Sequence, residues 1–159
     1  MEAGTDLTNK YYSFYKDNIS RIESSSFPLF NSIREESINK FASMGIPTQK
    51  NEAYKYTNLA TYFDYDYKDF FIPGPEDFAK AEKFSCSIED LDSYVIILFN
   101  GFYPPVHNNQ AELPGGIWLG SLKEASKKFP SLVEEHFGKY ARIDNDGLIS
   151  LNTAMASDG

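Results

Sequence analysis

The stretch Ser24 to Pro47 reads SSSFPLFNSIREESINKFASMGIP and decides the fold of this chain. Within it, residues three and four positions apart share one face of a helix, and most of them are apolar. They are Phe30, Ile33, Ser37 and Phe41, with Ile38 and Met44 at the margin of the same face. The spacing predicts an amphipathic helix whose apolar face packs against another element.

Both ends of this predicted helix carry recognisable start and stop residues. Ser26 can serve as the N-cap, and Pro28 fits the first turn because its missing N–H would be unpaired there anyway. At the other end, Gly45 can adopt the left-handed conformation of a C-cap. Ile46 can then fold back against the last turn, and Pro47 prevents continuation.

The N-terminal segment predicts a second helix of the same kind. From Asp6 to Ile22 the apolar residues again recur at intervals of three and four: Leu7, Tyr11, Phe14, Tyr15, Ile19 and Ile22. Ser24-Ser25-Ser26 interrupts the pattern. We therefore expect residues 1–47 to form an antiparallel helical hairpin.

Residues 48–93 form a tyrosine-rich connecting region. Thr48 to Thr57 is polar, whereas Tyr62 to Tyr67 (YFDYDY) alternates aromatic and acidic residues almost throughout. That alternation predicts a half-buried strand or an extended edge segment. Pro73-Gly74-Pro75 requires a loop, after which Glu76 to Lys83 can form one or two helical turns.

Residues 94–120 predict a small antiparallel sheet. Tyr94 to Phe99 (YVIILF) is short, apolar and rich in β-branched and aromatic residues, as strands are. Asn100-Gly101 suits a type I′ turn because both central residues need positive φ, and Phe102-Tyr103 begins the return strand. After a turn at residues 113–116, Ile117 to Gly120 predicts a third short strand.

Residues 121–157 predict short helices. Ser121 and Glu124 form a capping box that opens a helix through Lys128, and Pro130 restarts a helix through His136. Asp146-Gly147 then precedes apolar residues at helical spacing: Leu148, Leu151, Ala154 and Met155. The predicted fold class is α+β, one domain over residues 1–159 in which a helical hairpin precedes a small antiparallel sheet and short helices.

Charge and hydropathy exclude several classes of partner. The 159 residues carry a formal net charge of -8 without a cluster of Lys or Arg, so nucleic acid and anionic membranes are poor partners. The longest apolar run, Val95 to Phe99, is far shorter than the roughly 20 residues that span a bilayer. Because Cys86 is the only cysteine and no secretion signal is visible, we expect the reducing cytoplasm.

Metal-ligating residues are sparse. Cys86, His107 and His136 are the only cysteine and histidines, and no two of them are closely spaced, so we expect no transition-metal site. Asp144-Asn145-Asp146-Gly147 resembles the middle of a calcium loop. Arg142 would repel a cation there, and Asp, Asn and Gly are ordinary turn residues, so this stretch predicts a turn.

Catalytic patterns are equally weak. Gly115-Gly116 lacks the spacing of a phosphate-binding loop, and the Ser121 hydroxyl is explained as a helix cap rather than a nucleophile. Two acidic pairs could act as acid and base, Asp64 with Asp66 and Glu134 with Glu135. We predict no catalytic, cofactor-binding or metal residue; a small hydrolase using Asp64 and Asp66 is the less favoured alternative.

The excess of tyrosine has two interpretations. The residues concerned are Tyr54, Tyr56, Tyr62, Tyr65 and Tyr67. Exposed tyrosines favour binding surfaces, which would suit a stand-alone protein-interaction adaptor. We favour the other interpretation, in which these rings cover the edge of the hairpin core, because a two-helix unit has few aliphatic residues of its own.

Three stretches resemble the SufD branch of the SufB/SufD family of the SUF iron–sulfur cluster assembly system. Met44 to Leu59 (MGIPTQKNEAYKYTNL) is similar to the family's Gly-x-Pro-Thr-x-Lys-x-Glu-x-Trp-Lys-Tyr-Thr segment. Ile117 to Tyr140 and Leu151 to Gly159 are similar to its second and third landmarks. Tyr54 stands where the family commonly has Trp, an exchange between two large rings with a polar tip.

The resemblance implies a non-catalytic scaffold role. In the family this N-terminal domain precedes a right-handed parallel β-helix that pairs SufD with SufB, and a C-terminal region that contacts the ATPase SufC. The iron–sulfur cluster is the product of the whole SufB-SufC-SufD complex, and the residues implicated in its assembly lie in those later parts. The resemblance therefore assigns no functional residue here, and Cys86 matches no family motif.

Overall fold

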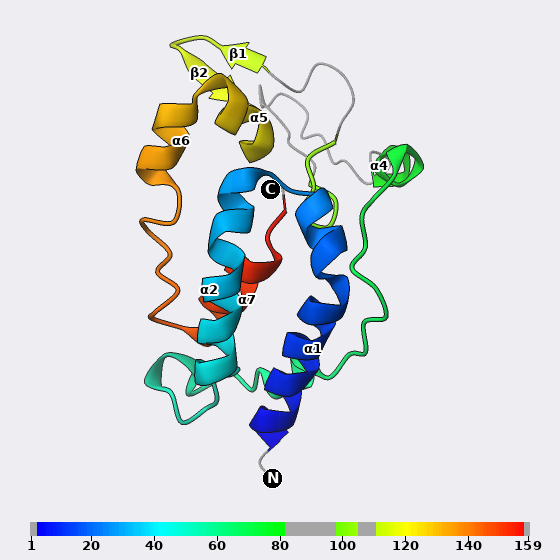
Figure 1. Cartoon of the computed structure of the whole chain (residues 1–159), viewed down its shortest axis with the longest axis vertical. Helices are drawn as coiled ribbons and strands as arrows, with labels where there is room; N and C mark the ends of the chain where they lie inside the picture. Colours follow the sequence, from blue (N-terminus) through cyan, green and yellow to red (C-terminus); the bar gives the residue numbers. More distant parts are fainter. Residues whose placement is uncertain (1–2, 82–97, 105–110, 158–159) are drawn as a thin grey trace, which may run out of the picture.

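The computed structural model describes residues 3–81, 98–104 and 111–157 of the chain (Figure 1). Of these residues 57% are helical and 5% lie in strands. Helices α1 (Ala3–Ser24) and α2 (Pro28–Met44) form the predicted antiparallel hairpin, and α7 (Gly147–Met155) packs against α2 (Figure 1). The elements between them lie around this three-helix unit.

Helix α1 buries the predicted stripe. Tyr11, Tyr15 and Ile22 are buried, and Leu7 and Ile19 pack against them while half-buried. The apolar periodicity was enough to predict this helix, because a helix of 22 residues repeats its apolar face over several turns.

Helix α2 ends as predicted and begins one residue later than predicted. Gly45 has φ +71°, and its N–H donates to the carbonyl of Phe41 over 2.7 Å, which closes the last turn. At the other end the N-cap is Phe27, with no side-chain cap, so the prediction of Ser26 is wrong. The Ser26 hydroxyl instead donates to the carbonyl of Ser157 over 3.1 Å, a distant partner that sequence spacing does not reveal.

The connecting region is less extended than predicted. A short 3-10 helix, η1 (Glu52–Tyr54), and one turn of α-helix, α3 (Ala60–Phe63), precede an irregular segment that leads to α4 (Pro75–Ala81). The half-buried strand at Tyr62 to Tyr67 is therefore wrong, because α3 takes up its first two residues and the rest pairs with no strand among the described residues. The helical turn after Pro73-Gly74-Pro75 is confirmed.

Of the predicted three-stranded sheet, the strand at Ile117 to Gly120 is confirmed as β2, but the described residues contain no three-stranded ladder. Within the described ranges the only ladder is the antiparallel pair β1 (Ala111–Leu113) and β2 (Ile117–Leu119), three residues each, in which Glu112 lies opposite Trp118. A ladder this short adds little to a fold that helix packing already holds together, so the α+β expectation gives way to a mostly helical architecture.

The Asn-Gly turn is confirmed, whereas most of its first strand falls outside the described residues. Asn100 and Gly101 have φ of +54° and +79°, and Phe99 and Phe102 form an isolated antiparallel bridge across them. Residues 94–97 of the predicted strand are not described. The ring of Phe99 packs edge-on against Phe78, with centroids 6.1 Å apart, which attaches this turn to α4.

The short C-terminal helices follow the sequence closely. Helices α5 (Leu122–Lys128) and α6 (Pro130–His136) begin and end where predicted, and the Ser121 hydroxyl accepts the N–H of Glu124 over 3.0 Å as an N-cap. The Phe137 ring, just after α6, packs edge-on against Phe30 with centroids 4.7 Å apart. This contact holds the α5–α6 pair against α2.

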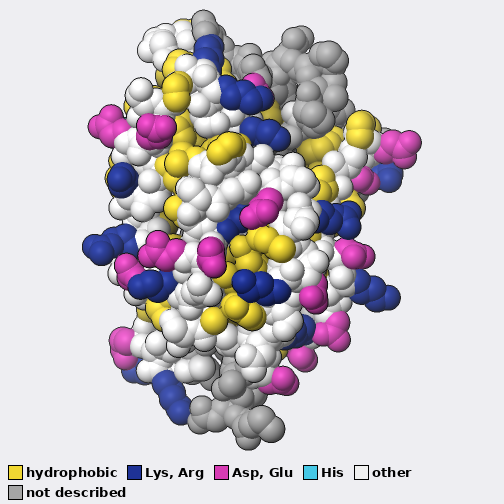
Figure 2. All heavy atoms as spheres, in the orientation of Figure 1, with side chains coloured by type: hydrophobic (Ala, Val, Ile, Leu, Met, Phe, Trp, Pro, Cys, Tyr) yellow, Lys and Arg dark blue, Asp and Glu magenta, His cyan; other side chains and the backbone are white. Residues whose placement is uncertain are grey.

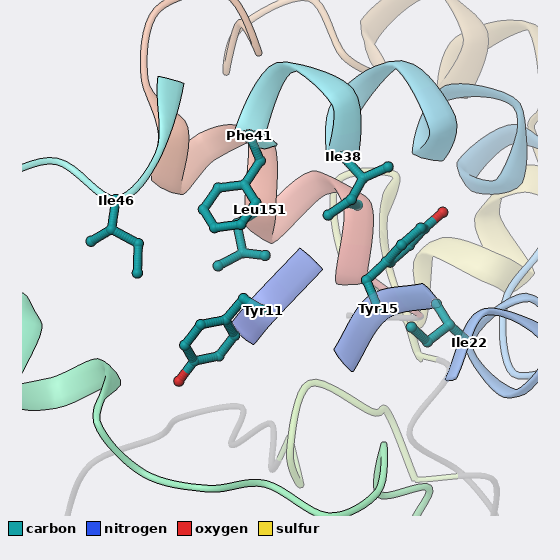
Figure 3. Close-up of a cluster of buried hydrophobic side chains, with 8 residues drawn as sticks. Tyr11, Tyr15, Ile22, Ile38, Phe41, Ile46 and Leu151 are labelled. Carbon is teal, nitrogen blue, oxygen red and sulfur yellow. The ribbon is translucent and has the colours of Figure 1, made fainter. Parts of the chain in front are cut away.

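The core lies where α1, α2 and α7 meet (Figure 3). Phe41 and Ile38 of α2 are fully buried and face Leu151 of α7, and Tyr11 and Tyr15 of α1 close the other side (Figure 3). Because α7 supplies Leu151 and Ala154 to this core, it is an integral third helix of the unit.

A buried arginine links α2 to the end of α7. The Arg34 side chain is only 1% exposed. Its Nε donates to Oδ1 of Asn31 over 2.9 Å and its Nη1 to the carbonyl of Ala154 over 2.7 Å, whereas Nη2 has no hydrogen-bond partner. Burial lowers the pKa of Arg34. A cation next to the carbonyls of a helix C-terminus is also favoured by the helix dipole.

Replacing Arg34 by alanine tests this link. We expect R34A to lower the free energy of unfolding by about 3 kcal/mol, because it leaves a cavity and a buried carbonyl without its donor. Arg142 is exposed, so R142A is the matched control and should change stability by less than about 0.5 kcal/mol. Urea unfolding measures both, and equal stabilities of the two variants would contradict this role for Arg34.

Candidate functional site

The described residues bring no metal-ligating side chains together. His136 lies exposed at the end of α6, where its ring stacks on Tyr140 with centroids 5.8 Å apart. Cys86 and His107 lie outside the described residues. Within residues 3–81, 98–104 and 111–157, no three His, Cys, Asp or Glu side chains converge on a point that could hold a metal ion.

The stretch that resembled a calcium loop is a turn and a helix cap. Residues 143–145 form the turn, and Asp144 pairs with Lys40, which lowers the pKa of Asp144 and raises that of Lys40. Oδ1 of Asp146 accepts the N–H of Leu148 over 2.6 Å as the N-cap of α7. The prediction of a turn is confirmed, since both carboxylates already have structural partners.

The acidic pairs lie on the surface. Asp64, Glu134 and Glu135 are exposed, and so is Asp66, which forms an ion pair with Lys10 over 2.6 Å. A general acid or base works in a site that excludes water, and these positions are open to solvent. Their geometry therefore gives no support to the hydrolase alternative.

Gly115 and Gly116 form the turn of the β1–β2 hairpin, as predicted. Their φ angles are +86° and +78°, in the left-handed region that glycine adopts without strain. A Cβ at either position would meet no atom within 4 Å, so the glycines are required by the turn and not by a closely approaching group.

The tyrosines do not cover the core as we predicted. Tyr56, Tyr62, Tyr65 and Tyr67 are 91%, 74%, 67% and 56% exposed, and only Tyr54 of the five is half-buried. Among the residues that cover the edge of the core are Leu59, Phe63 and Phe70, which are partly buried and pack against it. Tyrosines and aspartates alternate between Tyr62 and Tyr67, which predicted a strand with one buried face. Most of this segment is irregular instead, so the tyrosines have no buried face to occupy.

Residues far apart in sequence meet at what we term the α2–α7 junction, formed by Gly45, Tyr54, Asp146 and Gly147. A Cβ on Gly147 would lie 1.9 Å from the carbonyl oxygen of Gly45, so the two backbones touch with no space for a side chain. The Tyr54 hydroxyl donates to Oδ2 of Asp146 over 2.7 Å. That carboxylate therefore joins the connecting region to α7 while its other oxygen caps the helix.

The two glycines of this junction are visible in the sequence, but their contact is not. Gly45 and Gly147 each stand at a helix end, where glycine is needed either for positive φ or for close approach. The sequence explained Gly45 by its φ, but only the fold shows that Gly147 has no space for a Cβ.

A groove of about 670 Å³ lies between α2, α6 and α7. Its lining is largely apolar and includes Phe30, Ile33, Val133, Phe137 and Ile143. The rim carries Glu36, His136 and Lys139. Because acidic and basic side chains both line the groove, its charge does not indicate whether a ligand would be an anion or a cation.

Charged side chains of both signs lie on the surface. On the face shown in Figure 2, acidic and basic side chains are interspersed with apolar ones, and several basic side chains lie near one another at the top of the view. None of the described helices is both long enough and apolar enough to span a bilayer.

A comparison with known protein families assigns the chain to one of them. The family model described as "SufBD protein N-terminal region" matches residues 5–159. The chain belongs to the SufBD family. The family is that of the SUF system of iron–sulfur cluster assembly. Neither a curated protein nor a solved structure matched the chain.

The junction joins one of the stretches that resemble this SufBD family to the start of α7. Met44 to Leu59 contributes Gly45 and Tyr54, and the N-terminus of α7, just before the stretch Leu151 to Gly159, contributes Asp146 and Gly147. The two stretches, almost 100 residues apart, also share the buried core through Ile46 and Leu151. Tyr54, where the family commonly has Trp, keeps a large ring with a polar tip that can donate to Asp146.

Adding a methyl group at Gly147 tests the close approach. We expect G147A to lower the free energy of unfolding by about 3 kcal/mol, because the new Cβ overlaps a backbone oxygen that cannot move independently. Gly74 is the control, since its Cβ would lie 3.8 Å from the nearest atom and G74A should change stability by less than about 1 kcal/mol. Thermal and urea unfolding measure both, and a G147A variant as stable as G74A would disprove the contact.

Removing the Tyr54 hydroxyl tests the second contact of the junction. We expect Y54F to destabilise the chain by about 1–2 kcal/mol, the value of a hydrogen bond to a charged acceptor at a half-buried site. Y56F removes the hydroxyl of a nearby exposed tyrosine and should be neutral. Urea unfolding compares them, and a neutral Y54F would contradict the assignment.

The same hydrogen bond predicts a pH dependence. The bond to Asp146, with burial as a smaller cause, raises the pKa of Tyr54 above its usual value of about 10. A pKa raised by folding gives stability that is complete below the unfolded pKa and is lost as pH rises through the folded one. We therefore expect wild-type stability to fall more steeply than that of Y54F above about pH 10, as chemical unfolding will show. Parallel curves would contradict this assignment.

Proposed function

We propose that this chain is the N-terminal domain of a SufD-like scaffold subunit that works in a SufB-SufC-SufD complex for iron–sulfur cluster assembly. The observation that carries the proposal is the family match over residues 5–159. Three stretches favour the SufD branch, and two of them share the buried core through Ile46 and Leu151. The domain is cytoplasmic in this proposal, as the single cysteine suggests.

The domain's proposed role is structural rather than catalytic. Its candidate acids are either exposed, as Asp64 is, or engaged as caps and ion pairs, as Asp146 and Asp144 are. The end of α7 and Ser157 just beyond it are held against the hairpin, because Arg34 donates to the carbonyl of Ala154 and Ser26 to that of Ser157. If a β-helix follows, as the family resemblance implies, this arrangement fixes where it starts.

Purification of the native protein that contains this chain tests the proposal. With an affinity tag on the chromosomal copy, we expect SufB and SufC to co-purify under conditions that preserve complexes, as identified by mass spectrometry. Recovery of SufC with a separate SufD, and without SufB, would assign the chain to the SufB branch instead. Recovery of none of these proteins would refute membership of the complex and favour the stand-alone adaptor.

The hydrolase alternative has a separate test. Replacing both Asp64 and Asp66 by Asn removes the acidic pair at an exposed site, so the double variant should fold normally. We expect it to support cluster assembly in cells as well as the wild type does, measured by the activity of an iron–sulfur enzyme. A loss of tenfold or more, at unchanged protein abundance and with unchanged co-purification of partner proteins, would favour a catalytic role for these carboxylates.

A further inference from the structure

The segment 62–69, which we term the tyrosine–aspartate loop, is held on α1 at both ends. The Tyr11 hydroxyl donates to the carbonyl of Phe63 over 3.1 Å, and the N–H of Phe70 donates to Oδ1 of Asn18 over 3.0 Å. Between these points Lys10 pairs with Asp66 over 2.6 Å. Figure 1 shows the chain between α3 and α4 passing along α1.

The loop has more chain than it needs for this distance. Tyr11 and Asn18 are seven residues apart in a helix, a rise of about 10 Å, whereas the seven residues from Phe63 to Phe70 could reach about 23 Å if extended. The segment is therefore not fully extended. Tyr65 and Tyr67 are 67% and 56% exposed, although Tyr67 also contacts Phe14 of α1, and their rings contact each other edge-on with centroids 4.8 Å apart.

The loop also leaves acceptors free. Within the part of the chain that the structure describes, the peptide groups of residues 65–69 make no hydrogen bond, and Asp64 and Asp69 have no ion-pair partner. The three exposed rings of Tyr62, Tyr65 and Tyr67 thus lie in the same loop as carboxylates and carbonyls that have no protein partner among the described residues.

The local charge indicates a cationic partner. The acidic groups on and beside the loop, Asp17, Asp64, Asp66 and Asp69, outnumber the two basic groups, Lys10 and Lys68. A groove of about 390 Å³ runs between the loop and α1. Asp17 and Asp66 line it together with Lys10 and Lys68 and the aromatic rings of Phe14 and Tyr67, so the acidic excess lies on the loop itself, at Asp64 and Asp69.

Arginine suits this surface better than lysine. A guanidinium group is planar, stacks on aromatic faces and donates in a fork to carboxylates and carbonyls, and it is less strongly hydrated than an ammonium group. Exposed tyrosines give contact area at small entropic cost, and a loop already held at both ends loses little freedom on binding.

We infer that the tyrosine–aspartate loop is a docking surface for an arginine-bearing segment of a partner protein. Guanidinium groups stack on Tyr65 and Tyr67 and donate to Asp64, Asp69 and the free carbonyls. The inference goes beyond the proposed scaffold role and does not depend on it, since the surface is described entirely by this chain's own residues.

A peptide titration tests the inference. The probe is the capped peptide Arg-Ser-Arg-Ser-Arg-Gly, added to the isotope-labelled chain and followed by NMR. We expect saturable shifts in the amide signals of residues 62–69, with an affinity at least threefold higher than for the same peptide with lysine in place of arginine. Shifts confined to other regions, or equal affinity for both peptides, would overturn the inference.

Variants separate the loop from general charge effects. Y65A/Y67A should weaken binding of the arginine peptide about tenfold, the loss of two exposed cation–π contacts, and D64N/D69N should weaken it several-fold. Y56A is the matched control, because Tyr56 is even more exposed but lies outside the loop, and it should bind as the wild type does. Unchanged affinity in Y65A/Y67A would refute the assignment, and failure of the co-purification above would leave it unaffected.

Discussion

The contact between Gly147 and the carbonyl of Gly45 is the constraint on which the described fold depends. With 1.9 Å between that oxygen and the position of a Cβ, no other residue type fits at Gly147 without moving a helix. Once the two backbones touch, the N-terminus of α7 meets the C-terminus of α2, and Leu151 and Ala154 enter the core made by the hairpin. The Tyr54–Asp146 hydrogen bond and the Arg34 link to Ala154 then fix the two ends of α7.

The sequence predicted the features that depend on neighbouring residues and missed those that depend on tertiary contacts. The hairpin, the Gly45 C-cap, the Ser121 N-cap and the Asn-Gly turn depend on residues within one or two turns of each other, so spacing was enough. Ser26 and Arg34 donate hydrogen bonds to carbonyls more than 100 residues away in the sequence. No local sequence pattern predicts such a partner. The prediction from the YFDYDY alternation was wrong because alternate residues share a face only in a strand that is paired in a sheet. This segment is not paired with a strand among the described residues and lies on a helix instead.

The structure gives the candidate tyrosines and carboxylates different roles from those that the sequence predicted. Tyrosines expected to cover the core lie on the surface, and the carboxylates considered for chemistry act as a cap at Asp146 and as an ion pair at Asp144. What the SufBD-family chain offers is therefore a rigid three-helix unit with an exposed aromatic and acidic loop on α1. Such an arrangement suits contacts with other proteins.

Native-state hydrogen exchange tests most directly the claim that α7 is part of the hairpin core. If it is, the slowest amides of α7, including the N–H of Ser150, should open only with global unfolding and show the same opening free energy as the slowest amides of α2. An opening free energy for α7 lower than that of α2 by about 2 kcal/mol or more would mean that α7 detaches by itself. That result would contradict the account.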